Sequence, residues 1–251
     1  MKKIIAANWK MNKTRAQAEE SAASLVQLCK NVVSEERELV VFPPFLSIPE
    51  VAAAFADVSH FAVGAQDVYP AQNGAFTGEI SPEMLRDGGA EWILTGHSER
   101  RHIIGESDDL IGRKTAFSLQ QNFKTMLCIG ETLEERETGQ LEGVLSRQLS
   151  GALVGIPDTA DWKTLAVAYE PVWAIGTGKV AGEKEIIETH AVVRRLLLER
   201  FPDFGEKIAI LYGGSVKPAN ASSIILLDNV DGLLVGGASL EASTFAEIVK
   251  A

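Results

Sequence analysis

Residues able to move protons and to stabilise negative charge follow short apolar segments of this sequence. Asn8 ends the first such segment and Lys10 comes just after it, His97 follows the fourth, and Glu170 follows the sixth. A carboxylate can act as a general base, an imidazole can donate or relay a proton, and a lysine stabilises negative charge as it develops. We therefore interpret these four residues as the candidate catalytic set.

Each of these residues also has an ordinary structural interpretation when it is considered alone. Lys10 could be a solvated lysine just past a strand, His97 a core or loop histidine, and Glu170 a plain carboxylate at a strand end. Together, however, these interpretations must account for a cation, an imidazole and a carboxylate at equivalent positions along the chain. Proton-transfer chemistry explains that coincidence better.

Two glycine loops add an anion-binding function to this chemistry. Gly213-Gly214-Ser215 follows the seventh apolar segment and Gly236-Gly237-Ala238-Ser239 follows the eighth. Glycine lets backbone N–H groups approach an anion closely, and a helix start adds partial positive charge. We therefore expect Ser215, Gly236 and Gly237 to bind a phosphate group. Neutral donors of this kind also explain how a chain of net charge −10 can hold an anion.

The elements that must position these residues alternate regularly along the chain. Eight short, nearly continuous apolar segments start about 20 to 45 residues apart and are typical of strands buried in a parallel sheet. They are Lys3–Asn8, Leu39–Phe42, Phe61–Gln66, Trp92–Thr95, Thr125–Ile129, Leu165–Tyr169, Ile208–Tyr212 and Gly232–Val235.

Segments with helical spacing lie between these strands. They include Thr14–Lys30, Lys184–Arg200, Val216–Leu226 with Ser215 as its expected N-cap, and Ser239–Lys250. In the first of them, Ala18, Ala22, Leu25 and Leu28 are expected on one side.

Alternation of strands and helices predicts an α/β fold, and we favour a single (β/α)8 barrel domain over residues 1–251. An open doubly wound sheet is the alternative. It is disfavoured because no dinucleotide-binding fingerprint follows the first strand. In a barrel, the βα loops meet at the carboxyl ends of the strands, which would bring the candidate residues together.

Composition excludes several classes of partner. There is no block of Lys and Arg in this acidic chain, so no nucleic acid is expected, and no apolar run approaches the ~18 residues of a membrane span. Cys29 and Cys128 are interpreted as small buried hydrophobes, without zinc-type spacing. We expect no metal, no organic cofactor and a cytoplasmic location.

Five segments together resemble the triosephosphate isomerase family, in the family's order and over essentially the whole chain. They are Asn8-Trp9-Lys10-Met11-Asn12, Gly96-His97-Ser98-Glu99-Arg100-Arg101, Ala168 through Gly178, Tyr212-Gly213-Gly214-Ser215-Val216 and Val235-Gly236-Gly237-Ala238-Ser239. The segment around Glu170 is the most specific of them.

The resemblance implies a TIM barrel enzyme, an intramolecular oxidoreductase of glycolysis and gluconeogenesis. It would interconvert dihydroxyacetone phosphate and D-glyceraldehyde 3-phosphate through an enediolate. Glu170 would be the base, neutral His97 the polarising and relaying group, and Lys10 the stabilising cation. Asn8 would help position that lysine. A helical turn after His97 would disfavour its protonated form.

Two loops gain a role from the same resemblance. Pro171–Lys179 resembles the family's mobile lid, in which the Gly176 N–H would meet the phosphate. Asp67–Glu79 resembles the loop through which two subunits form a homodimer. Its tip, Phe76-Thr77-Gly78, would support Lys10 and Glu99 of the partner. One departure occurs here, because Asp67 stands where many members have asparagine, and its charge puts local packing in question.

Two alternatives remain open. The chain could be another phosphosugar isomerase or epimerase barrel, although metal-dependent epimerases need more histidine ligands at strand ends than this sequence supplies. His60, His102 and His190 are not well placed for that purpose. It could also be a non-catalytic phosphosugar-binding barrel, which would have no need of Glu170 and His97.

Overall fold

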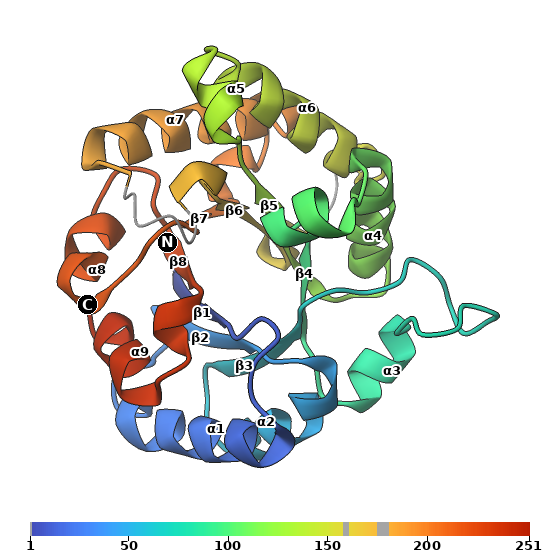
Figure 1. Ribbon diagram of the computed structural model, residues 1–251, viewed down its shortest axis with the longest axis vertical. Helices are drawn as coiled ribbons and strands as arrows, with labels where there is room; N and C mark the ends of the chain where they lie inside the picture. The colour runs from blue at the N-terminus through green and yellow to red at the C-terminus, as the bar shows by residue number, and fades with distance from the viewer. Residues whose placement is uncertain (1, 158–160, 175–180) are drawn as a thin grey trace.

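Parallel strands closed into a barrel form the centre of the computed structural model, which describes residues 2–157, 161–174 and 181–251 (Figure 1). In these residues, the strands pair in the order β1-β2-β3-β4-β5-β6-β7-β8, and β8 pairs back with β1. The strands are β1 (Lys3–Asn8), β2 (Arg37–Phe42), β3 (Phe61–Ala65), β4 (Trp92–Thr95), β5 (Lys124–Ile129), β6 (Leu165–Tyr169), β7 (Ala209–Tyr212) and β8 (Gly232–Val235). The predicted (β/α)8 fold is confirmed.

Helices ring this barrel and cover its outer face (Figure 1). The α-helices are α1 (Arg15–Cys29), α2 (Ile48–Phe55), α3 (Pro82–Asp87), α4 (Asp108–Gln120), α5 (Leu133–Glu137), α6 (Leu141–Leu153), α7 (Glu183–Arg200), α8 (Pro218–Ile225) and α9 (Ala242–Val249). Single turns are η1 (Phe45–Ser47), η2 (Arg100–Ile104), η3 (Trp162–Thr164), η4 (Val172–Ala174), η5 (Gly205–Lys207) and η6 (Gly237–Ser239).

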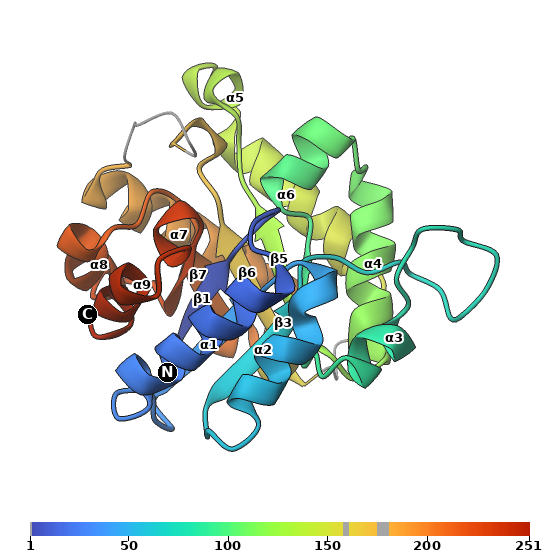
Figure 2. The same ribbon diagram turned by 60° about the horizontal axis from the view of Figure 1, so that its bottom comes forward.

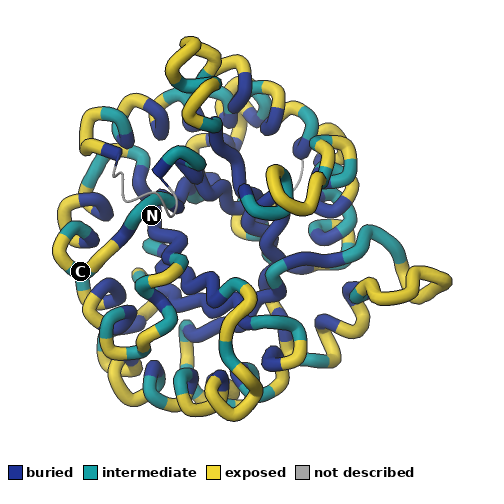
Figure 3. Tube along the Cα trace, viewed as in Figure 1, coloured by how far each residue is buried: buried dark blue, intermediate teal, exposed yellow. Residues whose placement is uncertain are grey.

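The continuous apolar strands are explained by burial on both faces. In β1, Ile4 and Ala6 belong to a cluster made of strand residues that fills the barrel, whereas Ile5 and Ala7 belong to the larger cluster shared with the helices. Successive side chains of a strand point to opposite faces, so both faces here must be apolar. Figure 3 shows the result, a buried barrel inside helices whose outer sides are exposed.

Helix α1 illustrates how local sequence sets an element. The side chain of Thr14 accepts a hydrogen bond from the Gln17 N–H, and the Gln17 side chain accepts one from the Thr14 N–H, which forms a capping box. Ala18, Ala22, Leu25 and Cys29 form the buried stripe. The expectation for Leu28 was wrong, because its position lies off this stripe and its side chain is 40% exposed.

The helix after β7 also begins later than expected. Ser215 is not its N-cap, because α8 starts at Pro218 and Lys217 occupies the cap position. Proline is suited to the first helical position, where its fixed φ is helical and its missing N–H costs nothing. Residues 215–217, which belong to neither a helix nor a strand, therefore connect the end of β7 to α8. Near the C-terminus, η6 and α9 similarly replace the single expected helix over Ser239–Lys250.

A long loop between β3 and α3 projects from the barrel in both ribbon views (Figures 1 and 2). Residues 72–79 in it are exposed, and Gly78 at its tip has a φ of 96°, a left-handed conformation that favours glycine. At its base, Asp67 is buried and paired. Its carboxylate lies 2.7 Å from Nζ of Lys114 and 2.7 Å from Nη2 of Arg100. The charge of Asp67 therefore has two buried or half-buried partners.

Candidate active site

The carboxyl ends of the strands surround a pocket of about 630 Å³, a size suited to a small ligand. All described candidate residues line it. They are Asn8, Lys10, His97, Glu170, Ser215, Gly236 and Gly237. Gly176, the remaining candidate, lies outside the described residues. The barrel thus brings together side chains and loops that are up to 229 positions apart in sequence, from Asn8 to Gly237.

Lys10 is held in an uncommon backbone conformation at the end of β1. Its φ is 51°, in the left-handed region that non-glycine residues rarely adopt. The side-chain oxygen of Asn8 accepts the Lys10 N–H at 3.0 Å, and Nε2 of Gln66 donates to the Lys10 carbonyl at 2.8 Å. Gln66 also donates to the Phe42 carbonyl at 2.9 Å, which ties this turn to the end of β2. Asn8 and Gln66 therefore fix the direction in which Lys10 leaves the strand.

The Lys10 ammonium group lies between a carboxylate and a glycine loop. Its Nζ is 2.6 Å from Oε1 of Glu99, a side chain that is 40% exposed. A Cβ added at Gly236 would lie 3.3 Å from Cε and 3.7 Å from Nζ of Lys10. The absence of that side chain leaves the cation open toward the loop after β8. An anion bound there could contact both the backbone of Gly236 and the charge of Lys10.

His97 follows the left-handed Gly96, whose φ is 67°, and immediately precedes a helical turn. The expected turn is confirmed, since helical backbone begins at Ser98 and continues into η2. The N–H of Glu99 donates to Nδ1 of His97 at 3.3 Å. Nδ1 is therefore an acceptor, and in the neutral ring the proton resides on Nε2. That nitrogen faces Glu170.

Glu170 directly follows β6 and is buried, with only 2% of the residue exposed. Its N–H donates to the Ile129 carbonyl at 2.7 Å, which continues the β5–β6 pairing by one residue. One carboxylate oxygen, Oε1, lies 2.9 Å from Nε2 of His97, and the other accepts the Ser98 N–H at 2.9 Å. The carboxylate is thus held by the same turn that presents the imidazole.

The electrostatics of this pair are set by burial and by mutual attraction. Burial has the largest single effect on His97 and lowers its pKa, but the carboxylates of Glu170 and Glu99 together raise it, and the net pKa lies above the ordinary value. Burial has the largest single effect on Glu170 and raises its pKa, but His97, the Ser98 N–H and Lys10 together lower it by more, and the net pKa lies below the ordinary value. In this arrangement the Glu170 carboxylate therefore favours the protonated ring of His97, which is opposite to the neutral ring expected from the helical turn alone.

The glycine loop after β8 lies against the residues that follow β1. Nε1 of Trp9 donates to the Ser239 carbonyl at 3.1 Å, and Nζ of Lys13 donates to the Leu240 carbonyl at 2.7 Å. These bonds fix the carbonyl side of η6 and leave its glycine-rich start at the pocket. No side chain occupies that start, because a Cβ at Gly237 would meet nothing within 4 Å. The loop is therefore open to a ligand.

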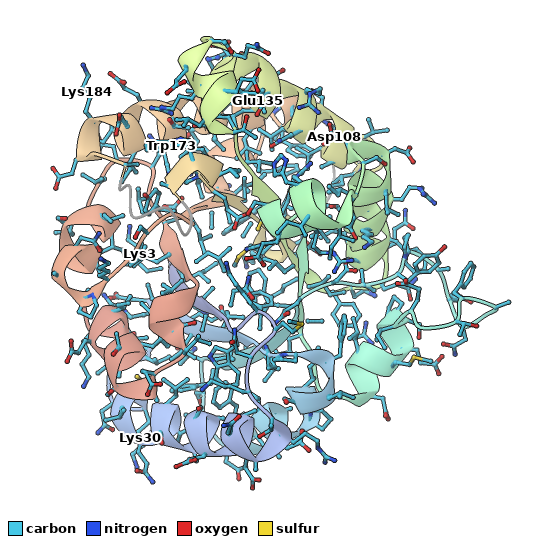
Figure 4. The ribbon with its side chains drawn as sticks, viewed as in Figure 1. Lys3, Lys30, Asp108, Glu135, Trp173 and Lys184 are labelled. Carbon is cyan, nitrogen blue, oxygen red and sulfur yellow. The ribbon has the colours of Figure 1, made fainter. Side chains whose placement is uncertain are left out.

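A buried glutamate supports the residues that follow Glu170. Oε1 of Glu131 accepts hydrogen bonds from Trp173 Nε1 at 2.8 Å and from the Tyr169 hydroxyl at 3.0 Å. Arg136 lies 2.9 Å from the same oxygen. Trp173, labelled in Figure 4, is thereby anchored on the carboxyl side of β6. Glu131 therefore links β6 to the turn η4 that follows Glu170.

Sequence reasoning did not single out every residue of this site. Gln66 supports Lys10, and His102 in η2 also lines the pocket, although His102 was considered only as a metal ligand and found not well placed for that. Gln66 has no local signal, because a contact from a side chain to a distant backbone carbonyl leaves no spacing pattern. Among the described residues, no group of three His, Cys, Asp or Glu side chains is arranged to hold a metal ion. None of the described helices is long and apolar enough to cross a membrane.

Comparisons with known proteins agree on one family. A sequence model described as "Triosephosphate isomerase" matches residues 3–251. A triosephosphate isomerase of Nitratidesulfovibrio vulgaris (strain DSM 19637 / Miyazaki F) is 59% identical over 251 residues, covering all of both chains. One from Aquifex aeolicus is 43% identical and covers 99% of each chain. The crystal structure of triosephosphate isomerase from Bartonella henselae has a TM-score of 0.88 at 34% identity, covering 99% of this chain and 98% of that one.

Proposed function

The chain belongs to the triosephosphate isomerase family, and we propose that Glu170 and His97 carry out the proton transfers of its reaction. The enzyme is an aldose–ketose isomerase of glycolysis and gluconeogenesis that interconverts dihydroxyacetone phosphate and D-glyceraldehyde 3-phosphate. The observation that carries the proposal is the 2.9 Å contact between Oε1 of Glu170 and Nε2 of His97 in the pocket.

Glu170 takes a proton from the carbon beside the carbonyl group. The electron pair of that C–H bond forms the carbon–carbon double bond of an enediolate, and the carbonyl oxygen gains negative charge. Return of the proton from Glu170 to the neighbouring carbon completes the isomerisation. A substrate oxygen that binds Nε2 of His97 takes the place of Oε1 of Glu170. The displaced carboxylate loses a donor, which makes it a stronger base.

His97 and Lys10 stabilise the enediolate from its oxygen side. Neutral His97 donates its Nε2 proton to the developing oxyanion and takes a proton back from the adjacent hydroxyl. When Glu170 is no longer beside the ring, burial and the N–H directed at Nδ1 favour this neutral form. Lys10 supplies positive charge, and Asn8 fixes its position. These groups contribute most where charge is greatest, in the transition state.

Ser215, Gly236 and Gly237 bind the phosphate group through N–H groups and a hydroxyl. Their openness to the pocket and the nearby Lys10 ammonium support this assignment.

Residues 1–251 function as a single barrel domain, and the cytoplasm is the proposed location. The two cysteines, buried and unpaired, suit a reducing compartment.

We test the roles of these groups with His97→Gln in a coupled assay. Glutamine can donate one hydrogen bond but cannot relay a proton, so kcat should fall by about 100-fold or more. Inhibition by inorganic phosphate should be unchanged, because the glycine loops are intact. A variant with wild-type kcat would exclude His97 as the relay.

We further propose that two copies pair through the loop Asp67–Glu79. Large apolar side chains are exposed on the loops that follow the neighbouring strands, with Met11 94% and Leu46 81% exposed after β1 and β2, and Ile103 79% exposed after β4. Large apolar side chains exposed at one end of a protein are typical of an interface. Sedimentation of the purified enzyme should give a dimer at assay concentrations. A fully active monomer would refute the pairing.

A further inference from the structure

The pairing of β4 with β5 ends where the chain turns away from the sheet, just before His97. Strands β4 and β5 pair in register from Trp92 opposite Lys124 to Thr95 opposite Leu127. The next residue, Gly96, has a φ of 67°, and the chain turns out of the sheet to present His97. Carbonyl groups past this point have no partner strand, and buried carbonyl groups need donors.

Arg101 supplies those donors. Its Nε donates to the Gly96 carbonyl at 2.7 Å, and its Nη2 donates to the Cys128 carbonyl at 3.0 Å. Gly96 and Cys128 are the residues that would pair next in the β4–β5 register. The planar guanidinium group thus bridges these two residues by hydrogen bonds, at the position where the backbone of β4 no longer pairs with β5.

The remaining nitrogen of the guanidinium group is anchored to α4. Nη1 lies 2.6 Å from Oδ1 of Asp108, and the Arg101 side chain is only 7% exposed. Asp108, labelled in Figure 4, is the first residue of α4 and also pairs with Arg147 of α6. Every nitrogen of the guanidinium group therefore has a partner, and its charge is matched by a carboxylate.

The fit at this turn is tight. A Cβ at Gly96 would lie 2.8 Å from Nη2 of Arg101 and 3.0 Å from the Cys128 carbonyl oxygen. The turn before His97 is therefore packed directly on the guanidinium group. Arg101 itself is not among the described residues that line the pocket.

We propose that Arg101 is a positioning residue for the isomerisation, which acts by holding the Gly96 turn so that Nε2 of His97 meets the reacting oxygen. This proposal rests on the proposed role of His97. Phosphate binding lies with the loops after β7 and β8, across the barrel from this turn. Loss of Arg101 should therefore impair the chemical step and leave phosphate binding intact.

The test compares Arg101→Ala, Arg101→Lys and Arg147→Gln in the full-length enzyme. A displacement of about 1 Å at a catalytic group can cost about 100-fold, so we expect kcat to fall about 10- to 100-fold in both Arg101 variants. The inhibition constant of inorganic phosphate should stay within about threefold of the wild-type value. Arg147→Gln is the matched control, because it removes the other, 57% exposed partner of Asp108 and should leave kcat unchanged.

Two readouts separate positioning from a general structural role. Free guanidinium ion, with sodium chloride at equal ionic strength as its control, should partly restore kcat of Arg101→Ala. In a double-mutant cycle, Arg101→Lys should cost much less in the His97→Gln background than alone, because both changes then act on one group.

A folded Arg101→Lys variant with wild-type kcat would overturn the proposal, whether or not its Tm falls. Full additivity with His97→Gln would overturn it as well. If Arg101→Ala does not fold, Arg101→Lys and the cycle decide alone. The proposals for His97 and Arg101 can fail separately. A wild-type kcat in His97→Gln would refute the role of His97. A lowered kcat in His97→Gln together with a wild-type kcat in Arg101→Lys would refute only the role of Arg101.

Discussion

Replacing Gly213 by alanine should slow the enzyme by moving Glu170, without removing any group that touches substrate. Gly213 follows β7, and its N–H donates to the Tyr169 carbonyl at 2.7 Å, so it lies directly beside the residue that precedes Glu170. Its φ is not in the left-handed region. An alanine is therefore tolerated by the backbone, and the effect comes from the added methyl group alone.

The size of the displacement follows from the distances. A Cβ at Gly213 would lie 2.9 Å from Cγ of Glu170 and 3.2 Å from the Tyr169 carbonyl oxygen. Carbon atoms in contact are normally separated by about 3.5–4.0 Å, so Cγ has to move by roughly 0.6–1 Å. A shift of about 1 Å at a reacting group can cost about 100-fold in rate. We expect kcat to fall about 10- to 100-fold.

The measurement is steady-state kinetics in both directions together with thermal unfolding. Gly143→Ala is the matched control, because Gly143 lies within α6 and a Cβ there would meet nothing within 4 Å. That variant should keep wild-type kcat and gain up to about 1 kcal/mol of stability, since alanine favours helix. Folded Gly213→Ala with a kcat within about twofold of the wild type would refute the displacement argument.

Two further predictions concern buried ionisable groups. Burial lowers the pKa of His190 to about 4, from 6.5 in the unfolded chain, so the unfolded state binds more protons in this range and stability is lost as pH falls from 6.5 toward 4. The loss should reach roughly 3 kcal/mol. His190→Asn should remove that part of the pH dependence in urea unfolding, and an unchanged slope would contradict the assignment. Asp67→Asn should destabilise the fold by only about 1 kcal/mol, because Glu106 still pairs with both Lys114 and Arg100 and because burial already raises the pKa of Asp67. Urea unfolding at fixed protein concentration measures this, and a loss of about 3 kcal/mol or more would show that Glu106 does not compensate for the missing carboxylate.

Much of the barrel could be predicted from the sequence because a strand buried on both faces is a nearly continuous run of apolar residues. The bounds of β1, β4, β6 and β8 agree with the predicted segments, and the remaining strands differ by one or two residues at an end. One helix start was predicted wrongly. Ser215 has the side chain of an N-cap residue, but Pro218 decides where α8 begins.

That the described candidate residues line one pocket could be predicted because strand ends converge, so side chains far apart in the sequence become neighbours by topology alone. What could not be predicted is how those side chains are held. Gln66 and Arg101 act through backbone carbonyl groups of other strands, and Arg101 and Cys128 are 27 residues apart. Such contacts depend on the path of the backbone after each strand ends. The periodicity of apolar residues in a segment carries no information about that path.

The central claim is that Glu170 moves the proton between the two carbons, and Glu170→Gln tests it most directly. The amide keeps the shape of the side chain but cannot act as a base. Turnover of glyceraldehyde 3-phosphate and incorporation of solvent deuterium into the product are measured together. We predict that both fall by at least about 100-fold while inorganic phosphate still binds. Wild-type turnover and deuterium incorporation in this variant would contradict the account.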